Sequence, residues 1–420
     1  MAPTLLPRPK PCSFTKVSGG CAASAWASRL LLACTVVTAC GVVQSQPRFQ
    51  PPADQVVLPA SLHALGGQSA ALREADLARR AAPGDIDKAL DYARAVFVLG
   101  LTEGDLRWYG AARAALAPWW DARALPARGH YLRGLVRQGF HDFAGGLQDI
   151  NAAITLDPAQ PEFWSWRFSL HLLASDMTAA AADCAEIAQR FGADEGNACR
   201  ATLFYRTGRA AEALPLFDAL VRKSDYQGEL TQGWLRFHQG EALRVAGQPD
   251  RAAQVWEQHL QAYPRAHGVR LALAKLYNEQ RQPDRARRVA SVKSPSDALL
   301  VQSLLASRAL NDGEAERLAA QVEGRMAVQA ERGEAMIERP QMVYYIRTGR
   351  DVPRGLALAV QNWREQNEPA DAVLLLEAAL QLNQPTAGEP VLRWMAATGY
   401  TDPVLAPLAG KLQAQLKGAR

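Results

Sequence analysis

The amino-acid sequence predicts an all-α protein, built as a right-handed solenoid of antiparallel helix pairs. Small, aromatic and proline residues recur about every 34 residues, most clearly at Gly240, Gly247, Ala252, Trp256 and Pro264. The composition is rich in Ala, Leu and Arg, and strand-like alternation of apolar and polar residues is scarce. In such a repeat, small residues let two helices approach closely, an aromatic ring fills the space between pairs, and proline ends the second helix.

The second-clearest window begins at Gly134. Gly134 and Gly146 supply the small contacts, Ile150 a packing residue, and Pro158 the end of the second helix. Three more windows repeat parts of the pattern, with these residues: Trp164 and Ala180; then Ala201, Phe204, Gly208, Ala213, Phe217 and Leu220; then Ala274, Tyr277, Ala286 and Ala290. In the first of these, Cys184 stands where the large residue of the second helix is expected. Five consecutive windows at nearly one spacing indicate a true internal repeat.

This pattern resembles the tetratricopeptide repeat, W-x2-L-G-x2-Y followed by A-x3-F and P. It is similar to proteobacterial cell-envelope proteins of this class to which no activity is assigned. The matches cover 127–293. The flanking segments 69–126 and 294–420 are expected to form atypical helical hairpins, because a terminal repeat lacks a neighbour on one side. The chain departs from the family at Arg236 and Gln239, in the Trp and Leu places, and at Arg133, Arg167 and Arg200, near the Leu place.

Residues 1–39 read as a secretory leader. They contain basic residues and no acid, and they end in an apolar run too short to span a bilayer. Val37, Thr38, Ala39 and Cys40 resemble the lipobox of bacterial lipoproteins, which implies lipid on Cys40, an anchor to the membrane and a location on the periplasmic side of the outer membrane. Two alternatives stay open: cleavage near Ser45, which gives a soluble periplasmic protein, or a cytoplasmic protein with a misread start.

The segment 40–68 is rich in Pro and Gln and reads either as a tether or as a terminus without a role. The whole chain of 420 residues has 47 basic and 42 acidic residues, a net charge of +5. Removing the four basic residues of the leader leaves 43 basic against 42 acidic residues. A nearly neutral mature chain has no electrostatic footprint for nucleic acid.

The sequence contains few of the residue patterns that are typical of enzyme active sites, metal sites or cofactor sites. The seven histidines and six cysteines show neither an H-E-x-x-H nor a C-x-x-C spacing, and phosphate loops and dinucleotide fingerprints are lacking. Asp183 and Glu186 lie one turn apart, which predicts a pair on a helix surface. Of the adjacent aromatics Phe163 and Trp164, one is expected to be exposed or to lie at the rim of the core, because neighbours on a helix point about 100° apart. We therefore expect no enzymatic activity, no cofactor and no metal.

Cys184 and Cys199 form a possible disulfide. They remain once the leader is removed and Cys40 carries lipid, and the envelope oxidises thiols. Packed helices stand about 8–10 Å apart, whereas a bridge needs Cα atoms within about 7 Å. The pair is therefore either a disulfide, if the helices approach unusually closely, or two buried thiols that pack as small apolar residues.

In the resembled family, the first helix of each pair lines a concave surface where ligands lie. Carried over to this chain, that surface contains Tyr131, Leu135, Gln138, Ser165, Ser169, Thr202, Tyr205, Arg206, Trp234, Phe237, Glu241, Arg244, Leu271, Lys275 and Asn278. Aromatic anchors beside arginine suit a protein or peptide ligand. The alternative is that these residues only pack against a neighbouring repeat.

The sequence thus predicts a non-catalytic cell-envelope adaptor that binds a protein or peptide through its concave face. One alternative is a binding subunit for glycan or lipopolysaccharide assembly, which would need aromatics together with acids and amides on one patch. A second is a soluble periplasmic scaffold of the same fold.

Overall fold

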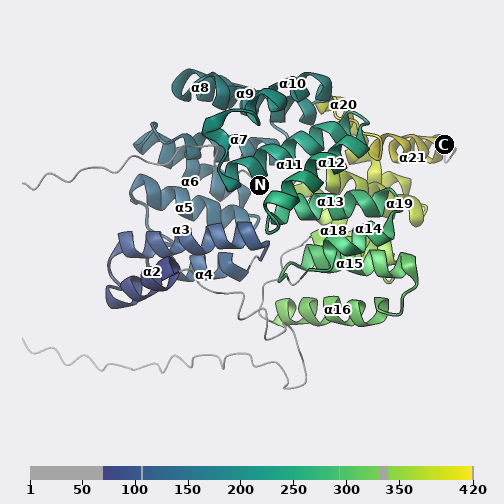
Figure 1. Cartoon of the computed structure of the whole chain (residues 1–420), viewed down its shortest axis with the longest axis horizontal. Helices are drawn as coiled ribbons and strands as arrows, with labels where there is room; N and C mark the ends of the chain where they lie inside the picture. Colours follow the sequence, from purple (N-terminus) through teal and green to yellow (C-terminus); the bar gives the residue numbers. More distant parts are fainter. Residues whose placement is uncertain (1–69, 106, 293, 332–338, 419–420) are drawn as a thin grey trace, which may run out of the picture.

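The computed structural model describes residues 70–105, 107–292, 294–331 and 339–418 (Figure 1). Within these ranges the regular secondary structure is entirely helical, which confirms the predicted all-α solenoid. The predicted leader, the tether and Cys40 lie outside the described residues. Among the described helices, none has the length and apolar character that a membrane span requires.

The helices follow one another with short connections. They are α2 (Ala70–Ala81), α3 (Ile86–Glu103), α4 (Arg107–Ala115), η1 (Ala117–Trp119), α5 (Ala127–Gly139), α6 (Phe143–Leu156), α7 (Pro161–Leu173), α8 (Met177–Phe191), α9 (Ala193–Arg206), α10 (Ala210–Leu220), η2 (Ser224–Tyr226), α11 (Glu229–Val245), α12 (Pro249–Ala262), α13 (His267–Glu279), α14 (Pro283–Ala290), α15 (Asp297–Leu310), α16 (Ala315–Glu331), α17 (Arg339–Thr348), α18 (Val352–Glu365), α19 (Pro369–Gln381), η3 (Pro385–Gly388), α20 (Glu389–Thr398) and α21 (Leu405–Gly418).

Two layers arise from the way these helices pack. Most helices contact the next one along the chain, and the odd-numbered helices from α3 to α19 also contact one another in series. The odd-numbered helices therefore form an inner layer and their even-numbered partners an outer one. The predicted close approaches are present. A Cβ on Gly134 would lie 3.0 Å from the carbonyl oxygen of Gly146, and a Cβ on Gly240 would overlap the indole ring of Trp256.

The turn inside each pair also repeats. The residue two positions before the second helix adopts a left-handed backbone conformation in five successive pairs: His141 (φ 61), Ser175 (φ 58), Gly208 (φ 75), Gly247 (φ 73) and Arg281 (φ 57). Glycine favours this conformation and most other residues resist it. The sequence pattern therefore revealed only the two glycine turns.

Two Arg–Asp pairs with buried aspartates explain two departures from the family pattern. Nε of Arg133 donates to Asp149 at 2.8 Å within the α5–α6 pair. About 34 residues later, Nε of Arg167 donates to Asp183 at 2.9 Å within the α7–α8 pair. An ion pair thus replaces apolar packing in two consecutive repeats. The predicted surface position of Asp183 is wrong, because its partner lies on the neighbouring helix and the residue is only 2% exposed.

The prediction that one of Phe163 and Trp164 is exposed is also wrong. Both are 5% exposed. Phe163 packs against Tyr131 on α5, with ring centroids 4.6 Å apart. On the other side of α7, the guanidinium groups of Arg167 and Arg190 lie 4.5 and 4.8 Å from the ring centre of Trp164 and cover it. Long arginine side chains can bury an aromatic ring that faces solvent.

The last third of the chain returns to the earlier repeats. Residues 363–404, which we call the closing segment, contact the ends of α7, α9 and α11. The Asn367 backbone N–H donates to Leu173 O at 3.0 Å, and Trp394 Nε1–H donates to Ser175 Oγ at 2.8 Å. Figure 1 shows α20 beside α10 at the upper edge of the molecule, where Gly399 lies against Gly208. We call this interface between distant turns of the solenoid the seam.

Candidate functional site

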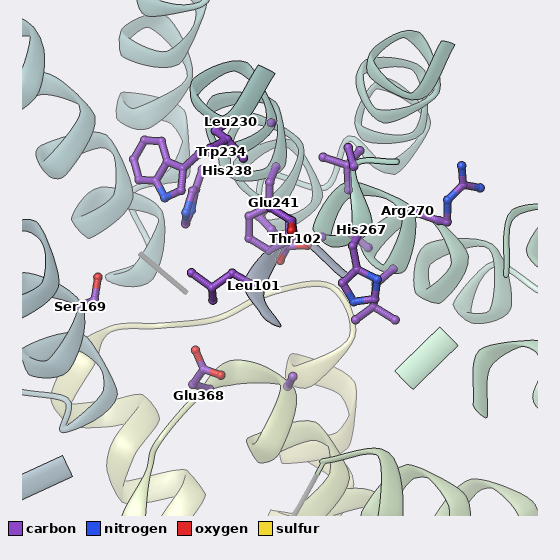
Figure 2. A pocket seen from close by; sticks show the side chains of 18 of the residues that line it. Leu101, Thr102, Ser169, Leu230, Trp234, His238, Glu241, His267, Arg270 and Glu368 are labelled. Carbon is purple, nitrogen blue, oxygen red and sulfur yellow. The ribbon is translucent and has the colours of Figure 1, made fainter. Parts of the chain in front are cut away.

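The inner layer and the closing segment line a cavity of about 1660 Å³ that is partly open to solvent. One wall comes from α3, α5, α7, α9, α11 and α13. The other comes from α17, α19 and the segment 400–404. Figure 2 looks into this cavity, with Trp234 and His238 beside each other on one side and Glu368 on the opposite side.

Fourteen of the fifteen residues that the sequence places on the concave surface lie in the cavity wall. The exception is Asn278. Its Nδ2 donates to the backbone oxygen and Oε1 of Gln302, at 3.1 and 2.9 Å, so it joins α13 to α15 instead. The family arrangement, carried over to this chain, placed Asn278 on the same face, but this position lies at the edge of that face, where the next inner helix covers it.

The sequence did not identify the opposite wall. Its residues include Arg339, Val343, Arg347, Glu368, Val373, Tyr400 and Asp402. The repeat pattern has decayed in this part of the chain, and these residues belong to the site only because the solenoid curls back on itself. The local sequence carries no signal for that curvature.

The cavity wall exposes apolar side chains. Of the five large apolar residues that are exposed in the described part of the chain, three lie in this wall: Val98 (37%), Leu230 (58%) and Val292 (38%). Leu101 lies near the middle of the view in Figure 2. Apolar surface that faces solvent inside a concave site indicates binding of an apolar group.

The charged residues of the wall are mostly paired. Arg244 NH1 lies 3.0 Å from Asp402, and Arg339 Nε lies 2.7 Å from Asp371. Burial would raise the pKa of Glu368, but the positive charges of Arg339 and Arg206 outweigh it and hold the pKa far below its usual range. The Glu368 carboxyl group is therefore ionised at neutral pH.

Lys275 differs from these arginines. Among the described residues, its ammonium group has neither a hydrogen-bond partner nor an ion-pair partner within 4 Å. Burial lowers the pKa of Lys275, while the more distant carboxylates of Glu279 and Glu241 counteract that effect. The ammonium group thus has donors available for a ligand in the cavity.

An aromatic cluster forms the wall at α9 and α11. The Tyr205 hydroxyl lies 2.7 Å from Nδ1 of His238, whose ring centroid is 4.3 Å from that of Trp234. Burial lowers the pKa of His238 well below its usual value, with a smaller contribution from Arg206, so the imidazole is neutral. Nε1 of Trp234 and Nε2 of His238 are buried without a partner in the described structure.

One serine–histidine contact borders the cavity. Oγ of Ser296 lies 3.4 Å from Nε2 of His267. The same hydroxyl accepts the Leu299 backbone N–H and so caps α15. Burial lowers the pKa of His267 to about 4. Ser296 is 1% exposed, so the contact joins α13 to α15. Within the described ranges, clusters of three potential metal ligands are also lacking.

Cys184 and Cys199 are joined by a disulfide, with Cα atoms 5.3 Å apart. The two helices can approach more closely than in ordinary packing because residue 196 is a glycine. A Cβ at this position would overlap Ala188. Only Gly192 connects α8 to α9. Cys199 lies in the cavity wall, so the disulfide fixes one of the inner helices to its outer partner.

Comparison with known proteins finds similarity to solved structures and none to a family model or a curated sequence. Solved structures similar to this chain include PilW, a widely conserved type IV pilus biogenesis factor, at TM-score 0.38 and 18% identity, covering 48% of this chain and 97% of PilW. A tetratricopeptide repeat protein from Parabacteroides merdae has a TM-score of 0.31 and 14% identity, and the match covers 69% of this chain and 98% of that protein. Yeast Tom70 has a TM-score of 0.40 and 12% identity, and the match covers 86% of this chain and 88% of Tom70. At these TM-scores, no ligand or partner carries over to this chain.

Proposed function

We propose that this protein is a non-catalytic adaptor that binds an extended segment of another protein, or a peptide, in the central cavity. The observation that carries the proposal is the 1660 Å³ cavity, whose described wall holds exposed apolar residues and an unpaired ammonium group. Sites for small molecules usually have volumes of about 300–1,000 Å³. A polypeptide segment fills a larger space, and its side chains and backbone suit a wall of mixed polarity.

The composition of the wall favours a polypeptide over a sugar. Sugar recognition requires aromatic rings beside acids and amides. In the described cavity wall, Gln138 is the single side-chain amide, and most of the carboxylates already pair with arginine. Aliphatic residues, by contrast, occur in the wall on α3, α5, α7, α11 and α13. A role in glycan or lipopolysaccharide assembly stays as the alternative that the binding experiment below distinguishes.

We place the protein in the cell envelope, attached through lipid on Cys40. The lipobox-like residues 37–40 support this location, and the Cys184–Cys199 disulfide fits an oxidising compartment. Feeding cells radiolabelled palmitate should label the wild type and not Cys40→Ser. Equal absence of label in both proteins would contradict lipidation and favour the soluble periplasmic alternative.

A peptide selection tests binding in the cavity directly. Phage-displayed random peptides of roughly a dozen residues are selected on the purified protein, and the affinity of the selected peptide is measured by calorimetry. Ser169→Trp places a large ring in the cavity and should abolish binding. Thr155→Trp is the matched control: both hydroxyls donate to the carbonyl four residues earlier, but Thr155 is exposed on α6, outside the cavity.

Two results would contradict the proposal. One is a selection that yields no binding peptide. The other is a peptide whose affinity is the same for Ser169→Trp and for Thr155→Trp, which would place its site outside the cavity. Purified lipopolysaccharide serves as a second probe, and its binding in the absence of peptide binding would favour the glycan alternative.

A further inference from the structure

We infer that the cavity wall contains a subsite for a carboxylate, formed by Arg206 on α9 and by Trp234 and His238 on α11. The segment bound in the cavity presents an acidic side chain, Asp or Glu, to these three residues. This inference rests on the proposed function and narrows the class of its ligand, from any extended polypeptide to one with an acidic anchor.

Unsatisfied polar atoms of the described structure gather at these residues. Eleven buried side-chain nitrogen or oxygen atoms lack a hydrogen-bond partner within the described ranges. Four of them lie on residues of the cavity wall: Nε and Nη2 of Arg206, Nε1 of Trp234 and Nε2 of His238. The other seven lie on seven different residues, and none of those residues lines the cavity. A buried polar group without a partner costs free energy, so a group of them at a cavity indicates that a ligand supplies the partner.

The three residues form one cluster. Trp234 and His238 lie one turn apart on α11, with ring centroids 4.3 Å apart, and Figure 2 shows the two rings side by side at the wall. Tyr205, the neighbour of Arg206 on α9, has its hydroxyl 2.7 Å from Nδ1 of His238. Burial lowers the pKa of His238 most, and the charge of Arg206 lowers it further, so the guanidinium lies near the imidazole.

All four unsatisfied atoms are hydrogen-bond donors. The nitrogen atoms of arginine and of the indole can only donate. The hydroxyl of Tyr205, which is 5% exposed, has Nδ1 of His238 as its one acceptor in the described structure. Because this buried hydroxyl has to donate, Nδ1 accepts, and the proton of the neutral imidazole lies on Nε2. The cluster therefore needs a ligand group that only accepts.

Arg206 has a free guanidinium edge of the kind that holds carboxylates elsewhere in this protein. Nε and Nη2 form a planar fork that matches the two oxygens of a carboxylate. The fork of Arg339 holds Asp371 in this way, at 2.7 and 2.8 Å, and that of Arg133 holds an aspartate likewise. In Arg206, by contrast, Nη1 lies 3.6 Å from Glu368 and the fork has no partner in the described structure.

A carboxylate fits this cluster better than a carbonyl group. Its two oxygens offer about four lone-pair sites to the four donors, whereas a carbonyl offers about two. Glu368 does not fill the fork, because it approaches Nη1 and is held by Arg339 at 2.5 Å. The cavity wall continues beyond the cluster on both sides, along α5 and α7 and along α13. The carboxylate therefore belongs to a side chain within the bound segment, not to its end.

A cycle of protein and peptide variants tests the pairing. We expect the peptides selected on the protein to share an acidic position. They are synthesised with an amidated C-terminus, and the acid is changed to its amide. This change should weaken binding to the wild type at least about ten-fold. Arg206→Lys keeps the charge and loses the fork, so it should bind both peptides equally weakly.

Arg209→Lys is the matched control for this cycle. Arg209 holds Glu212 with the same fork, at 2.7 and 2.6 Å, and lies outside the cavity wall. This variant should distinguish the two peptides as strongly as the wild type does. Lys275→Met tests the other cation that lacks a partner in the described wall, and it should also preserve the difference between the peptides.

The indole donor is tested in the same way. Trp234→Phe removes the N–H and retains a ring, and it should weaken binding of the acidic peptide about five-fold. Trp256→Phe is its control, because Trp256 Nε1 donates to Arg236 O inside one helix pair, outside the cavity wall. This control should leave the affinity unchanged. Equal affinities of the two variants would overturn the role of Trp234 as a donor.

The stability of the free protein distinguishes a ligand site from a structural role. The fork of Arg206 makes no hydrogen bond in the described structure, so Arg206→Lys should leave the urea midpoint unchanged. Arg133→Lys loses a fork that holds Asp149 and should lower the midpoint. An equal drop in both variants would show that Arg206 holds the fold, which would overturn the inference.

The binding data can also overturn the inference while the proposed function stands. They do so if the selected peptides share no acid, if Arg206→Lys still distinguishes acid from amide, or if Lys275→Met abolishes that difference instead. Binding that requires a free C-terminal carboxylate would overturn the assignment to a side chain. In each case Ser169→Trp still shows whether the peptide lies in the cavity. If the selection yields no peptide, the proposed function fails and this inference fails with it.

Discussion

Two tryptophans on consecutive helices illustrate how position within one repeat determines the role of a residue. Trp256 on α12 is fully buried between the helices of its pair, against Gly240, and its indole N–H donates to Arg236 O at 3.0 Å. Trp234 on α11 is 8% exposed, lies in the cavity wall and lacks a partner for its N–H in the described structure. The first ring holds the pair together, and the second forms part of the site.

We predict that Trp256→Ala lowers the free energy of unfolding by about 3–5 kcal/mol, because it leaves a cavity and an unsatisfied carbonyl. Trp234→Ala should cost less, because the space it leaves merges with the existing cavity. Urea denaturation followed by circular dichroism measures both. The reverse order of the two effects would show that the inner and outer faces of this repeat are assigned wrongly.

The second prediction at this scale concerns Cys184 and Cys199. Thiol counting on the denatured, unreduced mature protein should find neither thiol free. Reduction should lower the free energy of unfolding by about 3 kcal/mol, because the bond closes a short loop in the unfolded chain. Two free thiols per chain would contradict the bond, and the residues would then pack as small apolar side chains.

At the scale of elements, the Arg–Asp pairs with buried aspartates join the two helices of a repeat. Asp149 accepts from Arg133 and lies 2.8 Å from Nδ1 of His130. All three residues are at most 8% exposed. The pairing recurs in the next repeat at Arg167 and Asp183. An arginine in the place of leucine is therefore compensated by an aspartate on the facing helix.

We predict that Arg133→Leu destabilises the protein by about 3–5 kcal/mol, because it leaves the Asp149 charge buried without its main partner. Adding Asp149→Leu should recover much of that loss, because two apolar residues can replace a buried ion pair. Thermal unfolding of the single and double variants measures the difference. Arg209→Ala, which breaks an exposed pair with Glu212, is the control and should leave the midpoint unchanged.

At the scale of the whole molecule, acid should weaken the seam. Burial raises the pKa of Asp402, but Arg244, the Leu405 backbone N–H and the Tyr400 hydroxyl outweigh it and hold the pKa below its usual value. A carboxyl group with a lowered pKa stabilises the folded state above its unfolded pKa of about 3.9, and this stabilisation is lost as the pH falls through the folded value.

We therefore expect the wild type to lose more free energy of unfolding between about pH 5 and pH 3 than Asp402→Asn does. Urea denaturation at a series of pH values measures the two slopes. Parallel slopes would mean that Asp402 contributes no ionisation-linked stability to the closed molecule.

The sequence alone determined the helix pairs, their spacing and the face that lines the cavity, because each depends on residues within one or two turns of one another. Tyr131, Thr202 and Lys275 lie in the wall as their positions on the first helices predicted. Turn residues without a glycine, such as His141 and Ser175, gave no signal, since several residue types can be held in that conformation by the flanking helices.

The tertiary structure decided whether the concave surface is an open groove or a cavity. Curvature accumulates from small rotations between successive pairs, and the packing of each pair sets its own rotation. No short sequence pattern encodes the summed rotation, so the sequence did not indicate that Glu368 and Asp402 pair with Arg206 and Arg244 across the seam. The local spacing specifies a repeat, whereas only the packed chain shows that its last third returns to the repeats in the middle of the chain.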